Sequence, residues 1–289
     1  MSKKLWQPSI IVKKNSNLFA FENYISKKLK IKFNRNYKKL LNWSIKNSPE
    51  FWSRFWDFSK IKGIKSNKKF RKSKTFYKNL FLPGSRLNFG ENLLSKNNNE
   101  KAVTFISENG FREERSWRQL NLNTNKISKF LKKINIKKGD RVAAYMPNTI
   151  ETVEAFIATT SLGGIWSSCS PDFGSKGVIE RFSQINPKVL FITDQYFYNG
   201  KKIDILNRLP EILKLIPSIK SVVISNYPGK KFIKNKYKFK KINLFKWNEL
   251  MQTNTEKIDF KRFDFETELA ILYSSGTTGK PKCICHRSG

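Results

Sequence analysis

The sequence has few cysteines, few acidic residues and no long apolar run, and each shortage excludes a class of protein. Three cysteines in 289 residues give no disulfide framework, which argues against a secreted, disulfide-stapled domain. No uncharged apolar run approaches the roughly 18 residues that a bilayer span needs. The apolar run near the start, Ile10-Ile11-Val12, is too short for the core of a secretion signal. We therefore expect a cytoplasmic protein without a membrane span.

Acidic residues are far outnumbered by basic ones, since 57 Lys and Arg stand against 22 Asp and Glu and leave a net charge of +35. Such a charge is typical of nucleic-acid binding proteins. The lysines are spread along the chain, however, and only residues 230–241 hold a dense run. No helix-turn-helix, zinc-finger, RRM or KH signature accompanies them, so we expect a solvated basic surface and no specific nucleic-acid partner. A basic module for nucleic acid or acidic membrane stays as an alternative.

Aromatic residues are abundant, and the apolar content of 39% with 24 Phe and 7 Trp is enough for a core. The length suits about two domains. In the first part of the chain, the pattern predicts short helices over residues 18–29, 37–46 and 49–58. A basic stretch of little periodicity and the turn at Pro83-Gly84 follow them. We therefore expect a helical N-terminal cap over residues 1–82.

The third of these helices has the clearest start. Ser48 suits the N-cap position, and Pro49 suits the first position inside a helix. Aromatic rings recur on one face of this helix, at Phe51, Trp52, Phe55 and Trp56. Such a stripe predicts that the four rings are buried in a core.

Apolar strands alternate with helical patterns over residues 83–289, which predicts an α/β fold. Helices are expected over residues 117–134, 150–161, 176–185 and 202–216, and strands over 141–146, 165–168, 189–193, 221–224 and 269–273. A hairpin is expected from 102–107 and 112–116, around Asn109-Gly110. Successive strand–helix–strand units imply a mostly parallel sheet with helices on its faces.

A cluster of hydroxyl, glycine and lysine side chains follows the last of these strands, in Tyr273-Ser274-Ser275-Gly276-Thr277-Thr278-Gly279-Lys280-Pro281-Lys282. Glycines let backbone N–H groups turn toward an anion, and hydroxyls and lysines bind phosphate. The spacing is not that of the Walker A loop, because only two residues separate the two glycines. Pro281 disfavours a helix, so we expect a strand over residues 283–286. A polar surface turn is the alternative.

These ten residues resemble the signature phosphate loop of the adenylate-forming superfamily, which comprises acyl-CoA synthetases, luciferases and peptide-synthetase adenylation domains. The rest of the chain resembles the acetoacetyl-CoA synthetase branch, through residues 6–8, 43–58, 83–94, 139–148, 161–174 and 198–201. Within these segments, Trp166 to Gly174 best separates acetoacetate enzymes from relatives that use acetate or propionate. The resemblance runs nearly end to end and implies that residues 83–289 form part of the AMP-binding adenylation domain.

The resemblance implies an AMP-forming acid–thiol ligase, with ATP, magnesium (Mg2+) and coenzyme A as cofactors. In such enzymes a carboxylate and ATP give an acyl-adenylate and pyrophosphate, and the thiol of coenzyme A then displaces AMP. By position, the resemblance assigns the β- and γ-phosphates of ATP to Ser274, Ser275, Gly276, Thr277, Thr278, Gly279 and Lys280, with Lys282 nearby. It also implies that Lys201 contacts a phosphate of coenzyme A, although an ordinary surface lysine is the alternative.

The other reactive side chains do not form a site in the sequence. Cys283 and Cys285 lie on one face of the expected strand and His286 on the other, so we expect no zinc site. Cys169 has no histidine partner nearby, which favours a small buried thiol.

The sequence ends at Gly289, directly after the candidate phosphate loop. In the family, the adenine-binding motif, the acidic magnesium ligand and the catalytic lysine come later. The resemblance therefore implies the N-terminal part of the enzyme, with unknown catalytic residues, no complete turnover by itself and a missing C-terminal half as a possible partner. Two alternatives stay open: an acetate, propionate or other short-chain synthetase, and a non-catalytic subunit that pairs with a separately encoded half.

Overall fold

The computed structural model describes residues 5–230, 238–254, 259–274 and 279–289. The chain divides into two compact units, Met1–Arg86 and Leu87–Gly289. None of the helices within the described residues is long and apolar enough to cross a membrane.

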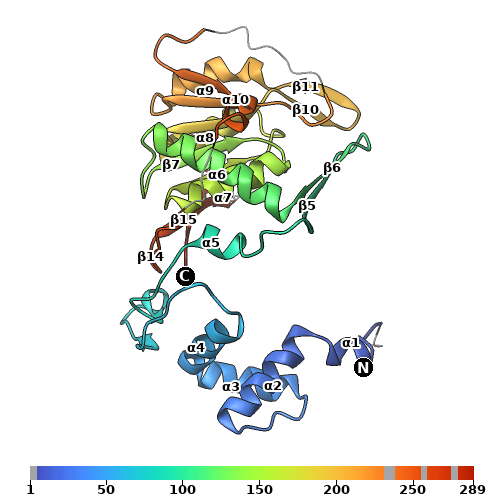
Figure 1. Cartoon of the computed structure of the whole chain (residues 1–289). Coiled ribbons are helices and arrows are strands. Elements are labelled where there is room, and N and C mark those ends of the chain that lie inside the picture. The colour runs from blue at the N-terminus through green and yellow to red at the C-terminus, as the bar shows by residue number, and fades with distance from the viewer. Residues whose placement is uncertain (1–4, 231–237, 255–258, 275–278) are drawn as a thin grey trace. The chain divides into compact units, whose positions relative to one another are not determined.

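The first unit is built from helices around a small aromatic core (Figure 1, blue). Its elements are α1 (Ile10–Lys14), α2 (Asn17–Leu29), α3 (Tyr37–Lys46), α4 (Ser48–Phe58), β1 (Gly63–Ile64), β2 (Phe70–Arg71), η1 (Phe76–Lys78) and β3 (Leu80–Phe81). The side chains of Ser16 and Asn36 accept backbone N–H groups at the starts of α2 and α3. The three helices predicted for this part of the chain are confirmed.

Helix α4 differs from its prediction at its start and along its aromatic face. It begins at Ser48, and Asn47 is the N-cap without a side-chain hydrogen bond, so the predicted Ser48 cap is wrong. Trp56 is buried, whereas Trp52 is 43% and Phe55 39% exposed within the described residues. The four rings spread over about 140° of the helix surface. Neighbouring side chains of this unit therefore bury only part of that arc.

The second unit contains a seven-stranded sheet in the order β13-β12-β9-β7-β8-β15-β16. Its strands are β7 (Arg141–Tyr145), β8 (Ile165–Cys169), β9 (Val189–Thr193), β12 (Ser221–Ser225), β13 (Asn243–Lys246), β15 (Glu268–Ser274) and β16 (Lys282–Arg287). All neighbours from β13 to β15 are parallel, and only β15 and β16 are antiparallel. The predicted α/β class with a mostly parallel sheet is confirmed.

Helices cover both faces of this sheet (Figure 1). One face packs against α6 (Trp117–Lys133), α7 (Ile150–Ser161) and α10 (Trp247–Met251), and the other against α8 (Ser175–Ile185) and α9 (Leu209–Leu215). Because side chains alternate along a strand, Val142 and Ala144 face the first group and Ala143 and Tyr145 the second. Two cores result, one on each side of the sheet.

The remaining elements are short. They are β4 (Arg86–Leu87), α5 (Phe89–Leu93), β5 (Lys101–Ile106), β6 (Arg112–Ser116) and β14 (Phe263–Asp264). Strands β5 and β6 pair antiparallel, so the hairpin predicted around Asn109-Gly110 is confirmed.

The helix predicted over residues 202–216 is wrong in its first half. The chain instead forms an antiparallel hairpin of β10 (Gln195–Tyr198) and β11 (Lys201–Asp204), then η2 (Leu206–Arg208) and α9. Asn199 and Gly200 have φ of 49° and 70°, as in the two-residue turn that an Asn-Gly step favours in a hairpin. Pro210 lies in the first turn of α9, where its missing N–H is not needed. The Asn-Gly turn therefore marks the hairpin of β10 and β11, and Pro210 marks the start of α9.

Candidate functional site

The carboxyl ends of the parallel strands lie at one edge of the sheet, and the connections there leave toward opposite faces. Helix α7 follows β7 and packs on one face, whereas α8 follows β8 and packs on the other. Such a reversal leaves a crevice outside the strand ends, where open α/β sheets bind ligands. Strand β15 lies parallel to β8, so its last residue, Ser274, is at this same edge. The loop after β15 therefore starts at the sheet edge where open α/β sheets bind ligands.

Half of the predicted phosphate-loop residues can be placed in the structure. Ser275, Gly276, Thr277 and Thr278 lie outside the described residues. Ser274 is half-buried and opposite the exposed Lys282 in the register of β15 and β16. Gly279 has a φ of 97°, and Lys280 is exposed. The chain enters β16 directly, which confirms the prediction of a strand in place of a helix.

The end of β15, from which this loop starts, is hydrogen-bonded to β8 through a side chain. The Ser167 hydroxyl is hydrogen-bonded to the carbonyl of Ile271 at 2.9 Å and to the hydroxyl of Tyr273 at 3.1 Å. Burial raises the pKa of the Tyr273 phenol, so this side chain stays neutral. From α8, the guanidinium of Arg181 lies 5.8 Å from the centre of the Tyr273 ring and 4.1 Å from that of Phe173. These contacts connect the loop after β8 to the end of β15.

Arg208 holds the loop that follows β8, a role that sequence reasoning missed. Its Nη1 donates hydrogen bonds to the carbonyls of Phe173 at 2.8 Å and Pro171 at 3.0 Å, and also to the hydroxyl of Tyr145. The two loop residues lie 35 and 37 positions earlier in the chain. No local pattern marks Arg208, because its partners are brought to it only by the fold.

Cys169, at the end of β8, is buried as predicted. Burial raises the pKa of its thiol to about 12. The thiol therefore stays protonated at neutral pH and is a poor nucleophile.

Lys201 lies at the start of β11 and is exposed. The turn before it has two N–H groups, those of Asn199 and Gly200, that donate to the carboxylate of Glu108 at 2.9 and 3.0 Å. The described structure thus places Lys201 on a hairpin of its own, on a different element from the loop after β15.

Cys283, Cys285 and His286 are all exposed on β16. Within the described residues, no group of three or more histidine, cysteine, aspartate or glutamate side chains could hold a metal ion. We therefore assign no metal ligand among them.

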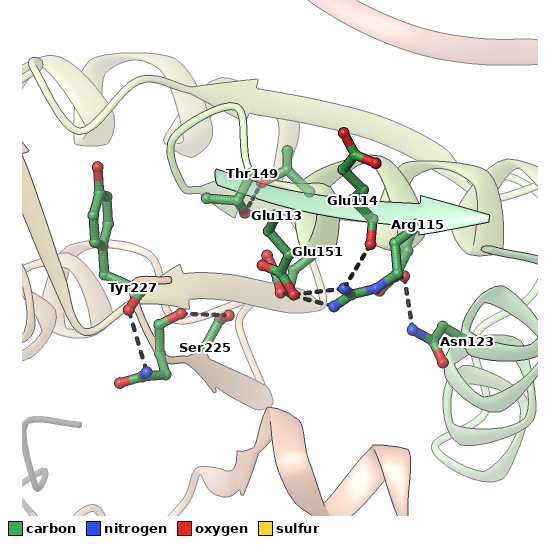
Figure 2. Close-up of polar contacts among 11 residues, drawn as sticks. Glu113, Glu114, Arg115, Asn123, Thr149, Glu151, Ser225 and Tyr227 are labelled. Carbon is green, nitrogen blue, oxygen red and sulfur yellow. Dashed lines mark hydrogen bonds and ion pairs between the residues drawn. The ribbon is translucent and has the colours of Figure 1, made fainter. Parts of the chain in front are cut away.

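A polar cluster that no sequence pattern predicted lies around α7, on the opposite face of the sheet from α8. Figure 2 shows Arg115 of β6 with Glu113 and Glu151 beside its guanidinium. The carboxylate of Glu154 accepts a hydrogen bond from Asn123 at 2.8 Å and lies 3.5 Å from Nε of Arg115. Burial raises the pKa of Glu154 to about 8 and also raises that of Glu151. The raised pKa values favour the protonated form of these buried carboxyl groups.

Comparisons with known proteins agree with this geometry. A family model described as "AMP-binding enzyme" matches residues 92–289. The chain is 37% identical to acetoacetyl-CoA synthetase from Xenopus tropicalis, over 100% of this chain and 44% of that protein. It is 34% identical to acetoacetyl-coenzyme A synthetase from Rhizobium meliloti, over 99% of this chain and 43% of that protein.

A solved structure of an acetoacetyl-CoA synthetase is also similar to this chain. Acetoacetyl-CoA synthetase from Streptomyces lividans matches with a TM-score of 0.89 and 27% identity, over 99% of this chain and 43% of that one. The resemblance inferred from the motifs is confirmed. The chain spans less than half the length of these relatives.

Proposed function

Because the chain belongs to the AMP-binding enzyme family, we propose that it works within an ATP-dependent acid–thiol ligase that activates acetoacetate. In this reaction acetoacetate and ATP give acetoacetyl-adenylate and pyrophosphate, and coenzyme A then displaces AMP to give acetoacetyl-CoA. The names of its relatives support this choice of acid. The observation that carries the proposal is the position of the Ser/Thr/Gly/Lys loop, which begins at the carboxyl end of β15, at the edge of the sheet where the parallel strands end.

We assign the β- and γ-phosphates of ATP to this loop. Its hydroxyl groups, glycine N–H groups and lysines are the donors that suit a polyphosphate, and four residues of the proposed set lie within the described structure: Ser274, Gly279, Lys280 and Lys282. Ser275, Gly276, Thr277 and Thr278 complete the proposed set. Holding the leaving pyrophosphate in place and screening its charge lowers the barrier to adenylate formation.

Magnesium (Mg2+) would accompany ATP and add charge screening at its phosphates. No cluster of carboxylates among the described residues could hold the ion, and we assign it to none of them. What this chain contributes is the binding and orientation of the phosphates through its lysines and hydroxyls.

Lys201 is our proposed contact for a phosphate of coenzyme A. Its exposed ammonium group beside a tight turn is free to reach an anion in solution. In the full-length protein, Lys201→Ala should raise the KM for coenzyme A and leave ATP–pyrophosphate exchange unchanged. An unchanged KM for coenzyme A would make Lys201 an ordinary surface lysine.

We further propose that residues 1–82 form an N-terminal cap and that residues 83–289 form part of the adenylation domain. The three free cysteines are consistent with the proposed cytoplasmic location.

The test of the proposed function is ATP–pyrophosphate exchange by the full-length protein in the presence of acetoacetate. The double variant Lys280→Ala plus Thr277→Ala should slow exchange by about 100-fold or more, because each of the two lost bonds to a charged group is worth about 1.5 kcal/mol or more. Lys214→Ala, at an exposed lysine of α9, is the matched control and should keep the parent rate. Unchanged exchange in the double variant would contradict the assignment of this loop.

A further inference from the structure

Helix α8 presents two side chains to the two ends of the loop between β15 and β16. Arg181 and Gln184 are three residues apart and therefore lie on one side of the helix. Arg181 lies over the ring of Tyr273, which directly precedes Ser274. Gln184 contacts Pro281, which directly follows Lys280. One helix face thus holds both the entry and the exit of the candidate phosphate loop.

Gln184 uses both ends of its side-chain amide in this contact. Its Nε2 donates to the carbonyl of Pro281 at 2.9 Å and to the carbonyl of Glu180 at 2.8 Å. Its Oε1 accepts from the thiol of Cys283 at 3.7 Å. Because donor and acceptor are both engaged, the amide has one preferred orientation. The contact therefore has a defined geometry, even though the side chain is exposed.

The residue that Gln184 holds lies where the loop leaves the sheet. The ladder between β15 and β16 begins at the pair Ser274 and Lys282, so Pro281 is the first residue outside it. Proline has no N–H, and its carbonyl is the backbone group that can be bonded there. The bond from Gln184 thus extends the anchored backbone by one residue, toward Lys280.

We propose that Gln184 is a positioning residue for the phosphate loop. By fixing the carbonyl of Pro281, it orients the backbone on either side, which carries Lys280 and Lys282. The four-carbon stem of lysine is flexible, so a fixed backbone narrows the region that each ammonium group can reach. This inference rests on the proposed function, in which these lysines bind the phosphates of ATP.

The experiment measures ATP–pyrophosphate exchange by the full-length protein as a function of MgATP and of acetoacetate concentration. The variant Gln184→Met keeps the length of the side chain and removes the amide. Ser183→Ala, at the exposed neighbouring position of α8, is the matched control. Loss of one such hydrogen bond corresponds to about a fivefold change in an equilibrium constant.

Gln184→Met should raise the KM for MgATP by about three- to tenfold, with the KM for acetoacetate and the melting temperature equal to those of Ser183→Ala. If the parent is active and Gln184→Met has an unchanged KM for MgATP, the role of Gln184 is overturned and the proposed function is not. A parallel rise of both KM values with a lowered melting temperature would also overturn it, because that is the signature of a structural role. A parent without any exchange would overturn the proposed function and this inference together.

Discussion

Replacing Glu154 by glutamine should change how the stability of the second unit depends on pH. The Glu154 side chain lies in the polar cluster on α7 and is fully buried. One of its oxygens accepts from Asn123, and the other, Oε2, is unpartnered within the described residues. Burial raises its pKa from 4.5 to about 8, even with Arg115 at 3.5 Å. The folded protein therefore holds a proton there at neutral pH.

The sign of the effect follows from where the proton is bound. Between pH 4.5 and about 8, the folded state keeps this proton and the unfolded state has lost it. The contribution of Glu154 to the free energy of unfolding is fully present below pH 4.5 and lost as the pH rises through about 8. Within that window the free energy of unfolding falls by about 1.4 kcal/mol per pH unit. Over the whole window the loss is at most about 5 kcal/mol.

The assay is denaturant unfolding at pH 5, 6, 7 and 8 for the parent and Glu154→Gln. Glutamine has the same shape and keeps an acceptor for Asn123, but it does not titrate. The stability of the variant relative to the parent should therefore rise by about 1.4 kcal/mol per pH unit up to pH 7 and less steeply toward pH 8, where the folded protein loses the proton. Glu211→Gln, at an exposed position of α9, should leave the pH dependence of the parent unchanged. Parallel curves for Glu154→Gln and the parent would refute the reasoning, because Glu154 would then be ionised in the folded state.

Three further substitutions test the packing of the second unit. Phe182→Ala, at a fully buried position of α8, should lower the free energy of unfolding by about 3–5 kcal/mol in denaturant titrations; a loss below about 1 kcal/mol would contradict the assigned core. Gly163→Ala should lower the free energy of unfolding more than Gly110→Ala does in the same titration. Both glycines have positive φ, but only at Gly163 would a Cβ lie 2.7 Å from the ring of Phe263. Arg208→Met should accelerate amide exchange in residues 170–174, since it removes the donor to two of their carbonyls; unchanged exchange would show that the loop is held by other contacts.

The central strands and their helices could be predicted from the sequence because their signals are local. The strand at residues 189–193 is apolar in its first four residues and buried throughout, as expected for a strand buried on both faces. Helix α6 begins after Ser116, which forms a capping box with Gln119. Such signals depend on residues within a few positions of each other, so no knowledge of the tertiary fold is needed.

The side-chain clusters could not be predicted, because their members meet only in the folded chain. Asn123 and Glu154 are 31 residues apart, and no periodic pattern pairs them. The hairpin at residues 195–204 did have a local signal in Asn199-Gly200, but the apolar residues of the helix that follows masked it.

The candidate phosphate loop could be predicted from the sequence in part. Its composition and Pro281 predicted a phosphate-binding loop that runs into a strand, and the strand is confirmed. Its place beside the end of β8 depends on the pairing of β15 with β8, and the bond between Ser167 and Ile271 spans 104 positions. Sequence motifs therefore predicted the chemistry of the loop, whereas its position depends on the topology of the sheet.

The most direct test of the central claim is the acid dependence of ATP–pyrophosphate exchange by the full-length protein at saturating MgATP. Acetoacetate, acetate and propionate would be compared by their kcat/KM values in the same preparation. We predict that exchange requires an added acid and that acetoacetate gives the highest kcat/KM. A higher value for acetate or propionate would contradict the acetoacetate assignment, and no exchange with any of the three acids would contradict adenylate formation itself.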